Sequence, residues 1–227
     1  MLLESVVPWG RLASEYINMF ALTPQDMKGR ILDIAAGPSS FNAELTGQGK
    51  SIVSVDPLYA FSAEQILSQF NANAETMLAL TEANADRFLW DEFKNPAQVA
   101  RIRRRAMTNF LEDFAAGKDA GRYIEGGLPT LPFDASTFEL ALCSHFLFTY
   151  SDQFSTDFHL ESIRELARVA GEVRVFPIVT QFTGDLSEHL PVAMDRVREL
   201  GYAVEVRRVE YEFQIGGNRM LSVRKPA

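Results

Sequence analysis

Hydrophobic and polar positions follow two different periods along the chain, and these periods predict the order of its elements. Short apolar runs at residues 30–34 and 50–56 are typical of buried strands. The residues from about Ser40 follow a helical pattern, so the region predicts a parallel strand–helix–strand unit with a right-handed crossover. Residues 10–20 predict a short amphipathic helix. Its apolar side is formed by Leu12, Tyr16, Met19 and Phe20.

The pattern between residues 62 and 116 is helical, with almost no strand signal. Its second helix is predicted to begin with Asn95 as the N-cap and Pro96 at the first helical position, and to end at Gly117. A simple crossover between neighbouring strands needs fewer residues. We therefore expect a helical insertion, about residues 60–121, that packs over one end of the sheet as a lid.

Strand and helix patterns alternate again in the second half of the chain. Strands are predicted at residues 122–127 and 172–179, and residues 138–148 predict a buried strand that runs into a loop. Helices are predicted at 151–170 and 189–200, each followed by a glycine. Residues 203–225 alternate with period two around Gly216 and Gly217, which predicts a closing β-hairpin. The prediction is one α/β domain over residues 1–227. Its Rossmann-like, doubly wound sheet has about seven strands, mostly parallel with an antiparallel C-terminal hairpin.

Composition and charge restrict the classes of partner. The 227 residues carry a net charge of −8, which disfavours nucleic acid because phosphate neutralisation dominates that affinity. No apolar run approaches the roughly 18 residues of a membrane span, and the first residues lack a secretory signal. With one cysteine and three histidines without metal-ligand spacing, we expect a cytoplasmic protein without a metal site. The basic run at residues 101–105, RIRRR, is either a solvated helix face or a docking patch for an anionic substrate.

The turn after the first strand, AAGPSS at residues 35–40, raises the question of a nucleotide site. A P-loop needs Gly-Lys-Ser/Thr at the helix start, which is missing here. A dinucleotide loop needs more glycines than Gly37, and Pro38 removes a backbone donor. The remaining interpretation is a loop of small residues that approaches a nucleoside. Asp56, 19 positions after Gly37, then accepts ribose hydroxyls, unless it only forms a turn with Pro57.

Several segments in this order resemble class I S-adenosylmethionine-dependent methyltransferases, from about residue 29 to the C-terminus. ILDIAAGPSSF resembles the first motif of that family, SVDP the second, and LPFDASTFELALCSHFLF the stretch that leads into the fourth strand beside the methyl donor. The closing hairpin is similar to the family's antiparallel last strand. The first residues, VVPWGRLASEY, resemble the opening of an uncharacterised bacterial branch.

This resemblance implies S-adenosylmethionine as the cofactor and assigns candidate contacts to it. Asp33 is expected to receive the cofactor's amino group, directly or through the loop, and Ala35 permits close approach if its φ stays negative. The family's acid after the third strand is absent, so the Leu128 backbone or Glu125 would have to contact the adenine. Arg11 is a candidate for the cofactor's carboxylate, which needs a cation, and its alternative is a surface arginine. The full set of expected cofactor contacts is Arg11, Asp33, Ala35, Gly37, Asp56, Pro57, Leu128, Cys143 and Ser144.

The end of the predicted fourth strand is expected to face the transferred methyl group. His145 is a candidate general base because its ordinary pKa lies near neutrality, and its alternative is a packed or backbone-bonded histidine. The family's Asp/Asn-Pro-Pro-Tyr/Phe motif for amino groups of nucleobases is missing, and so is an acid cluster for a divalent metal. Aromatic residues nearby suggest an apolar substrate site, with further aromatics in the insertion. They are Phe146, Phe148, Tyr150 and Phe154, and Phe88, Trp90, Phe93 and Phe110.

The sequence therefore favours a methyltransferase for a small molecule with apolar character. A cofactor-binding partner or regulatory protein without catalysis is the main alternative. It is favoured because the loop at residues 35–40 has few glycines and because the acidic residue that contacts adenine in the family is missing. A nicotinamide oxidoreductase is disfavoured by Pro38 and by the terminal hairpin.

Overall fold

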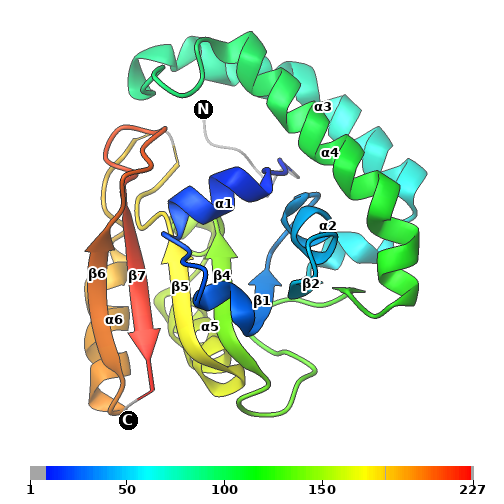
Figure 1. The fold of residues 1–227 in the computed structure, drawn as a ribbon. Helices are drawn as coiled ribbons and strands as arrows, with labels where there is room; N and C mark the ends of the chain where they lie inside the picture. Colours follow the sequence, from blue (N-terminus) through cyan, green and yellow to red (C-terminus); the bar gives the residue numbers. More distant parts are fainter. Residues whose placement is uncertain (1–8, 182, 226–227) are drawn as a thin grey trace.

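Seven strands form one sheet in the computed structural model, which describes residues 9–181 and 183–225 (Figure 1). Their order across the sheet is β3-β2-β1-β4-β5-β7-β6. The strands are β1 Arg30–Ile34, β2 Ser51–Val55, β3 Tyr123–Ile124, β4 Phe138–Ser144, β5 Ala170–Phe176, β6 Ala203–Arg208 and β7 Arg219–Arg224. The helices are α1 Ala13–Met19, α2 Phe41–Thr46, α3 Ala63–Ala83, α4 Pro96–Asp119, α5 Thr156–Val169 and α6 His189–Glu199.

Strand pairing confirms the predicted mixed sheet. β3, β2, β1, β4 and β5 are parallel, and Ile34 at the end of β1 lies between Val55 of β2 and Cys143 of β4. β7 pairs antiparallel with both β5 and β6, so the predicted hairpin is present and its second strand is the inner one. The carboxyl ends of β1, β2 and β4 therefore meet at one edge, where parallel sheets place their ligand sites.

The sheet is covered on both faces, which explains why its central strands read as continuous apolar runs. Successive residues of β1 point to opposite layers. Ile31 packs with Tyr16 of α1 and Phe41 of α2, whereas Leu32 packs with α5 and α6 residues such as Leu166. No helix among the described residues is long and apolar enough to cross a membrane.

α3 and α4 form a long pair that passes over the carboxyl ends of the strands (Figure 1). The Oδ1 atom of Asn95 accepts a hydrogen bond from the Gln98 N–H at 2.9 Å, with Pro96 at the first helical position as predicted. The predicted end at Gly117 is wrong, because α4 continues to Asp119. Gly117 is needed for packing instead, since a Cβ there would lie 2.4 Å from the Tyr123 ring.

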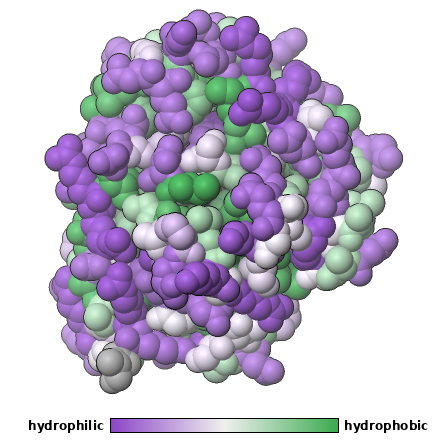
Figure 2. All heavy atoms as spheres, viewed as in Figure 1, coloured by the Kyte–Doolittle hydropathy of each residue, from purple (hydrophilic) through white to green (hydrophobic). Residues whose placement is uncertain are grey.

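The connection between α3 and α4 packs against the loop that joins β6 to β7. The Leu89 N–H donates to the Phe213 carbonyl at 2.8 Å, and the rings of Phe88 and Phe213 stack at 4.7 Å. These contacts join the α3–α4 connection to the β6–β7 loop above the carboxyl edge of the sheet. Figure 2 shows apolar side chains gathered in the middle of this face, between the α3–α4 pair and the sheet, with polar residues around them.

Candidate active site

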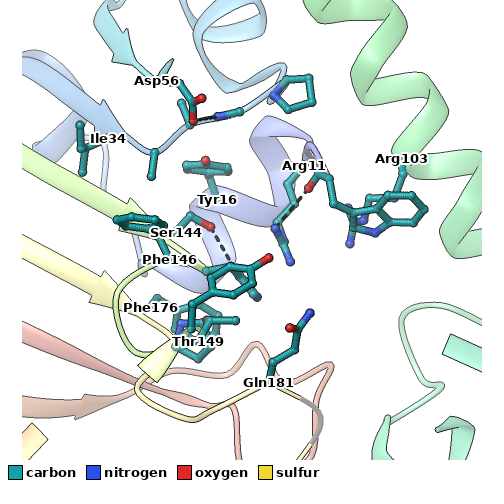
Figure 3. A pocket seen from close by; sticks show the side chains of 18 of the residues that line it. Arg11, Tyr16, Ile34, Asp56, Arg103, Ser144, Phe146, Thr149, Phe176 and Gln181 are labelled. Atoms are coloured by element: carbon teal, nitrogen blue, oxygen red, sulfur yellow. Dashed lines mark hydrogen bonds between the residues drawn. The ribbon is translucent and has the colours of Figure 1, made fainter. Parts of the chain in front are cut away.

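A pocket of about 400 Å³ lies at the carboxyl edge of the sheet, beneath α4 (Figure 3). Its walls come from distant parts of the chain: the start of α1, the β1–α2 turn, the ends of β2, β4 and β5, the β3–β4 loop, the α3–α4 segment and the β6–β7 loop. Eight of the ten residues expected from the sequence line it. They are Arg11, Ala35, Gly37, Asp56, Pro57, Leu128, Ser144 and His145.

The β1–α2 turn is held open by its backbone conformation. Gly37 has a φ of +52°, and nothing lies within 4 Å of the place where a Cβ would stand. Ala35 also has a positive φ, +53°, so the expectation that this alanine keeps a negative φ is wrong. A left-handed alanine costs about 1–2 kcal/mol, and the contact of its N–H with the Val55 carbonyl at 2.9 Å helps to hold it there.

Asp56 links this turn to the end of β2. Its Oδ2 accepts the Gly37 N–H and its Oδ1 accepts the Leu58 N–H, both at 2.8 Å. The carboxylate thus forms the turn that the alternative interpretation expected, and it also lines the pocket. Each oxygen keeps a second lone pair for a hydroxyl donor. Burial raises the pKa of Asp56, although the Leu58 and Gly37 N–H groups oppose this effect.

Asp33 and Cys143 do not line the pocket. Both are fully buried in the sheet beneath it. Burial raises the pKa of Asp33 well above its usual range, and the Ser54 hydroxyl lies 3.4 Å from its Oδ2. Burial also raises the pKa of Cys143 to about 12, so this thiol is uncharged at neutral pH. Both residues support the strands that carry the pocket, and neither reaches its space.

Ser144 and His145 stand at the end of β4. The Ser144 Oγ and the His145 Nδ1 are 3.0 Å apart, and the His145 N–H donates to the Phe176 carbonyl at 2.6 Å. His145 has a φ of +49°, an unusual conformation that turns the chain into the pocket wall. Burial lowers the pKa of His145 well below its ordinary value, and Arg11 and Arg103 lower it further. The imidazole is therefore neutral at physiological pH, and burial and the two arginines make it a weaker base than a free histidine.

Arg11 approaches the pocket from the start of α1. Its carbonyl accepts the Ser40 N–H at 3.0 Å and the Ser39 hydroxyl at 3.0 Å, so the β1–α2 turn fixes the backbone of Arg11. Gly10 permits this close approach, since a Cβ there would lie 2.0 Å from the Pro38 carbonyl oxygen. The Arg11 Nη1 is 3.4 Å from the Trp9 carbonyl, and its buried Nε has no partner among the described residues.

A buried ion pair joins α1 to α4 beside Arg11. The Arg103 Nη1 lies 2.6 and 2.8 Å from the two carboxylate oxygens of Glu15, and both side chains are at most 2% exposed. Burial alone lowers the pKa of Arg103, but Glu15 more than offsets this and raises it. The Tyr211 hydroxyl adds a weaker contact to Glu15 at 3.4 Å. Arg103 also lines the pocket, a role that the sequence offered only as part of the RIRRR run.

The remaining wall is largely aromatic, as the sequence suggested, but with different members. Phe88, Phe146 and Tyr150 line the pocket. Phe148 is fully buried, and Phe154 stacks on Phe158 at 4.5 Å. The sequence analysis missed the following lining residues: Thr149, Phe176, Gln181, Tyr211, Phe213 and Gln214. Their positions depend on how distant loops meet, and no local motif marks them.

Comparison with known proteins places the chain in a family. It is 32% identical over 224 residues to Uncharacterized protein MJ0045 of Methanocaldococcus jannaschii, covering 98% of both chains. The chain belongs to the MJ0045 family. This relative is archaeal, so it gives no support to the bacterial branch expected from the sequence. No family model matches the chain.

One solved structure shares the fold of this MJ0045-family chain. The PH0226 protein of Pyrococcus horikoshii OT3 aligns with 94% of this chain and 91% of that chain, at 12% identity and a TM-score of 0.50. Magnesium protoporphyrin IX methyltransferase of Synechocystis PCC 6803, solved with bound SAM, aligns with 94% and 78%, at 11% identity and a TM-score of 0.48. Such identities bear on the fold alone. The observed sheet, parallel with an antiparallel last strand, is the class I methyltransferase fold predicted from the sequence.

Proposed function

We propose that the protein is an S-adenosylmethionine-dependent methyltransferase that acts on a small acceptor with apolar character. The main support is one shared pocket. Asp56 and the open turn at Gly37 lie at one side of it, and His145 and an aromatic wall lie at the other. A nucleoside donor and an acceptor therefore have places in the same enclosed space.

The residues present fit the cofactor. Gly37 leaves open space above the turn, and Asp56 keeps lone pairs for the two ribose hydroxyls. The buried Nε of Arg11, without a partner among the described residues, suits the cofactor's carboxylate. Pro57 and Leu128 line the same pocket and are our candidates for the adenine contact.

The cofactor, which Arg11 and Asp56 would hold, would supply an electrophilic methyl group on a sulfonium with a neutral thioether as the leaving group. The chain's own residues position the acceptor and exclude water. We assign to His145 the proton that the acceptor loses, because its neutral imidazole lines the pocket, and its lowered pKa makes it a weak base. Ser144 orients the ring through Nδ1, which leaves Nε2 for this proton.

Calorimetric titration with S-adenosylmethionine, S-adenosylhomocysteine and NADH tests the cofactor. We expect micromolar binding of the two sulfur nucleosides, no binding of NADH, and at least tenfold weaker binding in Asp56→Ala. Asp86→Ala, an exposed acid outside the pocket, is the matched control. Binding of NADH alone, or of no nucleoside, would overturn the proposal. A chain that binds S-adenosylhomocysteine but no acceptor would favour the non-catalytic alternative.

We also propose that residues 60–121 act as a lid over this pocket. α4 contributes Val99 and Arg103 to the wall, and the α3–α4 connection contributes Phe88. A lid that closes over a ligand is expected to become harder to cut. Limited proteolysis with and without S-adenosylhomocysteine checks this, and unchanged cutting between residues 62 and 116 would count against the role.

A further inference from the structure

Two guanidinium groups and one carboxylate meet at the α1–α4 side of the pocket. Glu15 receives both contacts from Arg103 Nη1, and it also accepts the Leu12 N–H at 3.1 Å. Arg11 lies close enough for Arg103 to lower its pKa, after burial as the larger cause. One carboxylate thus faces two buried cations.

Some N–H donors of the Arg103 guanidinium have no hydrogen-bond partner among the described residues. Its Nε is buried and has no hydrogen-bond partner among the described residues, and the side chain is 1% exposed. A guanidinium presents five N–H donors in a flat fork, so the contacts with Glu15 leave donors over. Figure 3 shows Arg103 extending from α4 toward the same space as Arg11. Donors left without partners at a buried site disfavour the empty state, and an anion removes that penalty.

The other charges around the pocket do not neutralise this excess. Burial raises the pKa of Asp33 well above its usual range, and His145 is neutral because its pKa is lowered. The Asp56 carboxylate lies at the β1–α2 turn, where it accepts the Gly37 and Leu58 N–H groups. Glu92 affects Arg103 from an exposed position, where water screens its charge. In the proposed function the cofactor's carboxylate uses Arg11. The Arg103 donors that do not contact Glu15 remain available for a second anion.

The walls next to Arg103 are apolar and aromatic. Tyr211 and Phe176 pack at 6.0 Å between centroids, and Phe176 in turn packs on His145 at 5.5 Å. These contacts connect the arginine side of the pocket with the proposed proton acceptor. At the far end, the Thr149 hydroxyl is buried without a partner among the described residues, and Gln181 lies beside it (Figure 3).

We infer that the methyl acceptor is a small aromatic carboxylate, and that Arg103 binds its carboxylate group. This inference rests on the proposed function, since it assigns the second half of the same pocket. A carboxylate fits better than a phosphate, because Glu15 and the cofactor's carboxylate already balance the two guanidinium charges, and a carboxylate adds one further negative charge where a phosphate adds about two. The flat fork of the guanidinium also matches the two oxygens of a carboxylate.

Helical spacing separates Arg103 from the rest of the RIRRR run. Arg101, Arg104 and Arg105 are exposed on the outer face of α4, whereas Arg103 points inward. The interpretation of this run as a solvated face holds for those three residues. The exposed arginines provide controls of the same chemistry on the same helix.

Binding of matched acids and amides to the full chain saturated with S-adenosylhomocysteine tests the inference. The probes are 4-hydroxybenzoate against 4-hydroxybenzamide, and indole-3-acetate against indole-3-acetamide, with phenyl phosphate as the phosphate arm. We expect at least one acid to bind tenfold more tightly than its amide and more tightly than phenyl phosphate. Arg103→Met should abolish this preference while S-adenosylhomocysteine still binds, and Arg105→Met should keep it.

Arg103→Met leaves Glu15 unpaired and can unfold the chain, so Glu15→Gln/Arg103→Met serves as the second variant. The inference is overturned if no acid outbinds its amide, if phenyl phosphate binds best, or if the preference survives in the double variant. Absence of S-adenosylhomocysteine binding to the wild type overturns the proposed function instead, and the two failures are thereby distinguished.

Discussion

The Glu15–Arg103 pair predicts a large and non-additive effect on stability. Glu15→Gln removes the only carboxylate that contacts Arg103 among the described residues, and Arg103→Met leaves that carboxylate buried and alone. Both side chains are at most 2% exposed, so little water screens either charge. Removing one partner of such a pair costs about 3–5 kcal/mol, whereas removing both charges is often nearly neutral. We expect each single variant to lose about 3–5 kcal/mol and the double variant to lose less than either.

Urea unfolding of the wild type, both single variants and the double variant measures this as a double-mutant cycle. With a urea dependence of roughly 2–3 kcal/mol per molar, each single variant should unfold at about 1–2 M lower urea. Glu199→Gln is the control, because the Arg196–Glu199 pair on α6 has a similar distance of 3.0 Å but is more than 60% exposed. That variant should change stability by less than about 0.5 kcal/mol. Single variants that cost under about 1 kcal/mol, or a double variant that costs their sum, would refute the reasoning.

Three further predictions concern the turn, its neighbour and pH. Ala35→Gly should raise the free energy of unfolding by up to about 1 kcal/mol in urea titrations. Glycine removes the strain of the left-handed backbone, and this gain exceeds the cost of a more flexible unfolded chain. Ala36→Gly is the control and should lower the free energy of unfolding. Gly10→Ala should lower the free energy of unfolding by about 1–3 kcal/mol, because its Cβ would stand 2.0 Å from the Pro38 carbonyl oxygen. The same variant should weaken S-adenosylhomocysteine binding in calorimetry. Gly47→Ala is the control and should change neither quantity, since its Cβ would stand 3.3 Å from the nearest atom. Burial lowers the pKa of His145 in the native chain, so below a pH of about 6.5 the unfolded chain binds a proton there and the native chain does not. His145 therefore makes the free energy of unfolding fall as the pH is lowered from about 6.5 to about 5. His145→Asn should flatten that fall in urea unfolding at several pH values, and an unchanged slope would contradict the neutral imidazole.

Local patterns predicted the order of the elements and much of the pocket, although some bounds differ: β3 covers only Tyr123–Ile124 of the strand predicted at 122–127. The strand at Arg30–Ile34 has the predicted bounds, and the Asn95–Pro96 start of α4 has the predicted cap. In a parallel sheet the carboxyl ends of strands meet at one edge, so a sequence that places Asp56 and His145 after two strands also brings them to one pocket. Local patterns failed where tertiary contacts decide. Gly117 resembles a helix stop, but the packing of Tyr123 requires a glycine inside the helix.

The inward position of Arg103 was available from spacing, although its partners were not. Val99, Ala106 and Phe110 are buried on α4 at intervals of three and four from one another or from Arg103, so the arginine falls on the apolar stripe of its helix. An arginine there must find a carboxylate or a ligand, because an unpaired buried cation is unfavourable. Its observed partner is 88 residues away in the chain, and Tyr211 on the other side of that carboxylate is 196 residues from it. No local pattern predicts such a meeting.

The sheet edge carries the proposed cofactor contacts, while α4 and the β6–β7 loop carry the charge and the aromatic walls beside it. Acceptor choice is therefore expected to depend on these two segments, and an exchange of residues 96–119 for those of a relative should change acid preference without loss of S-adenosylhomocysteine binding.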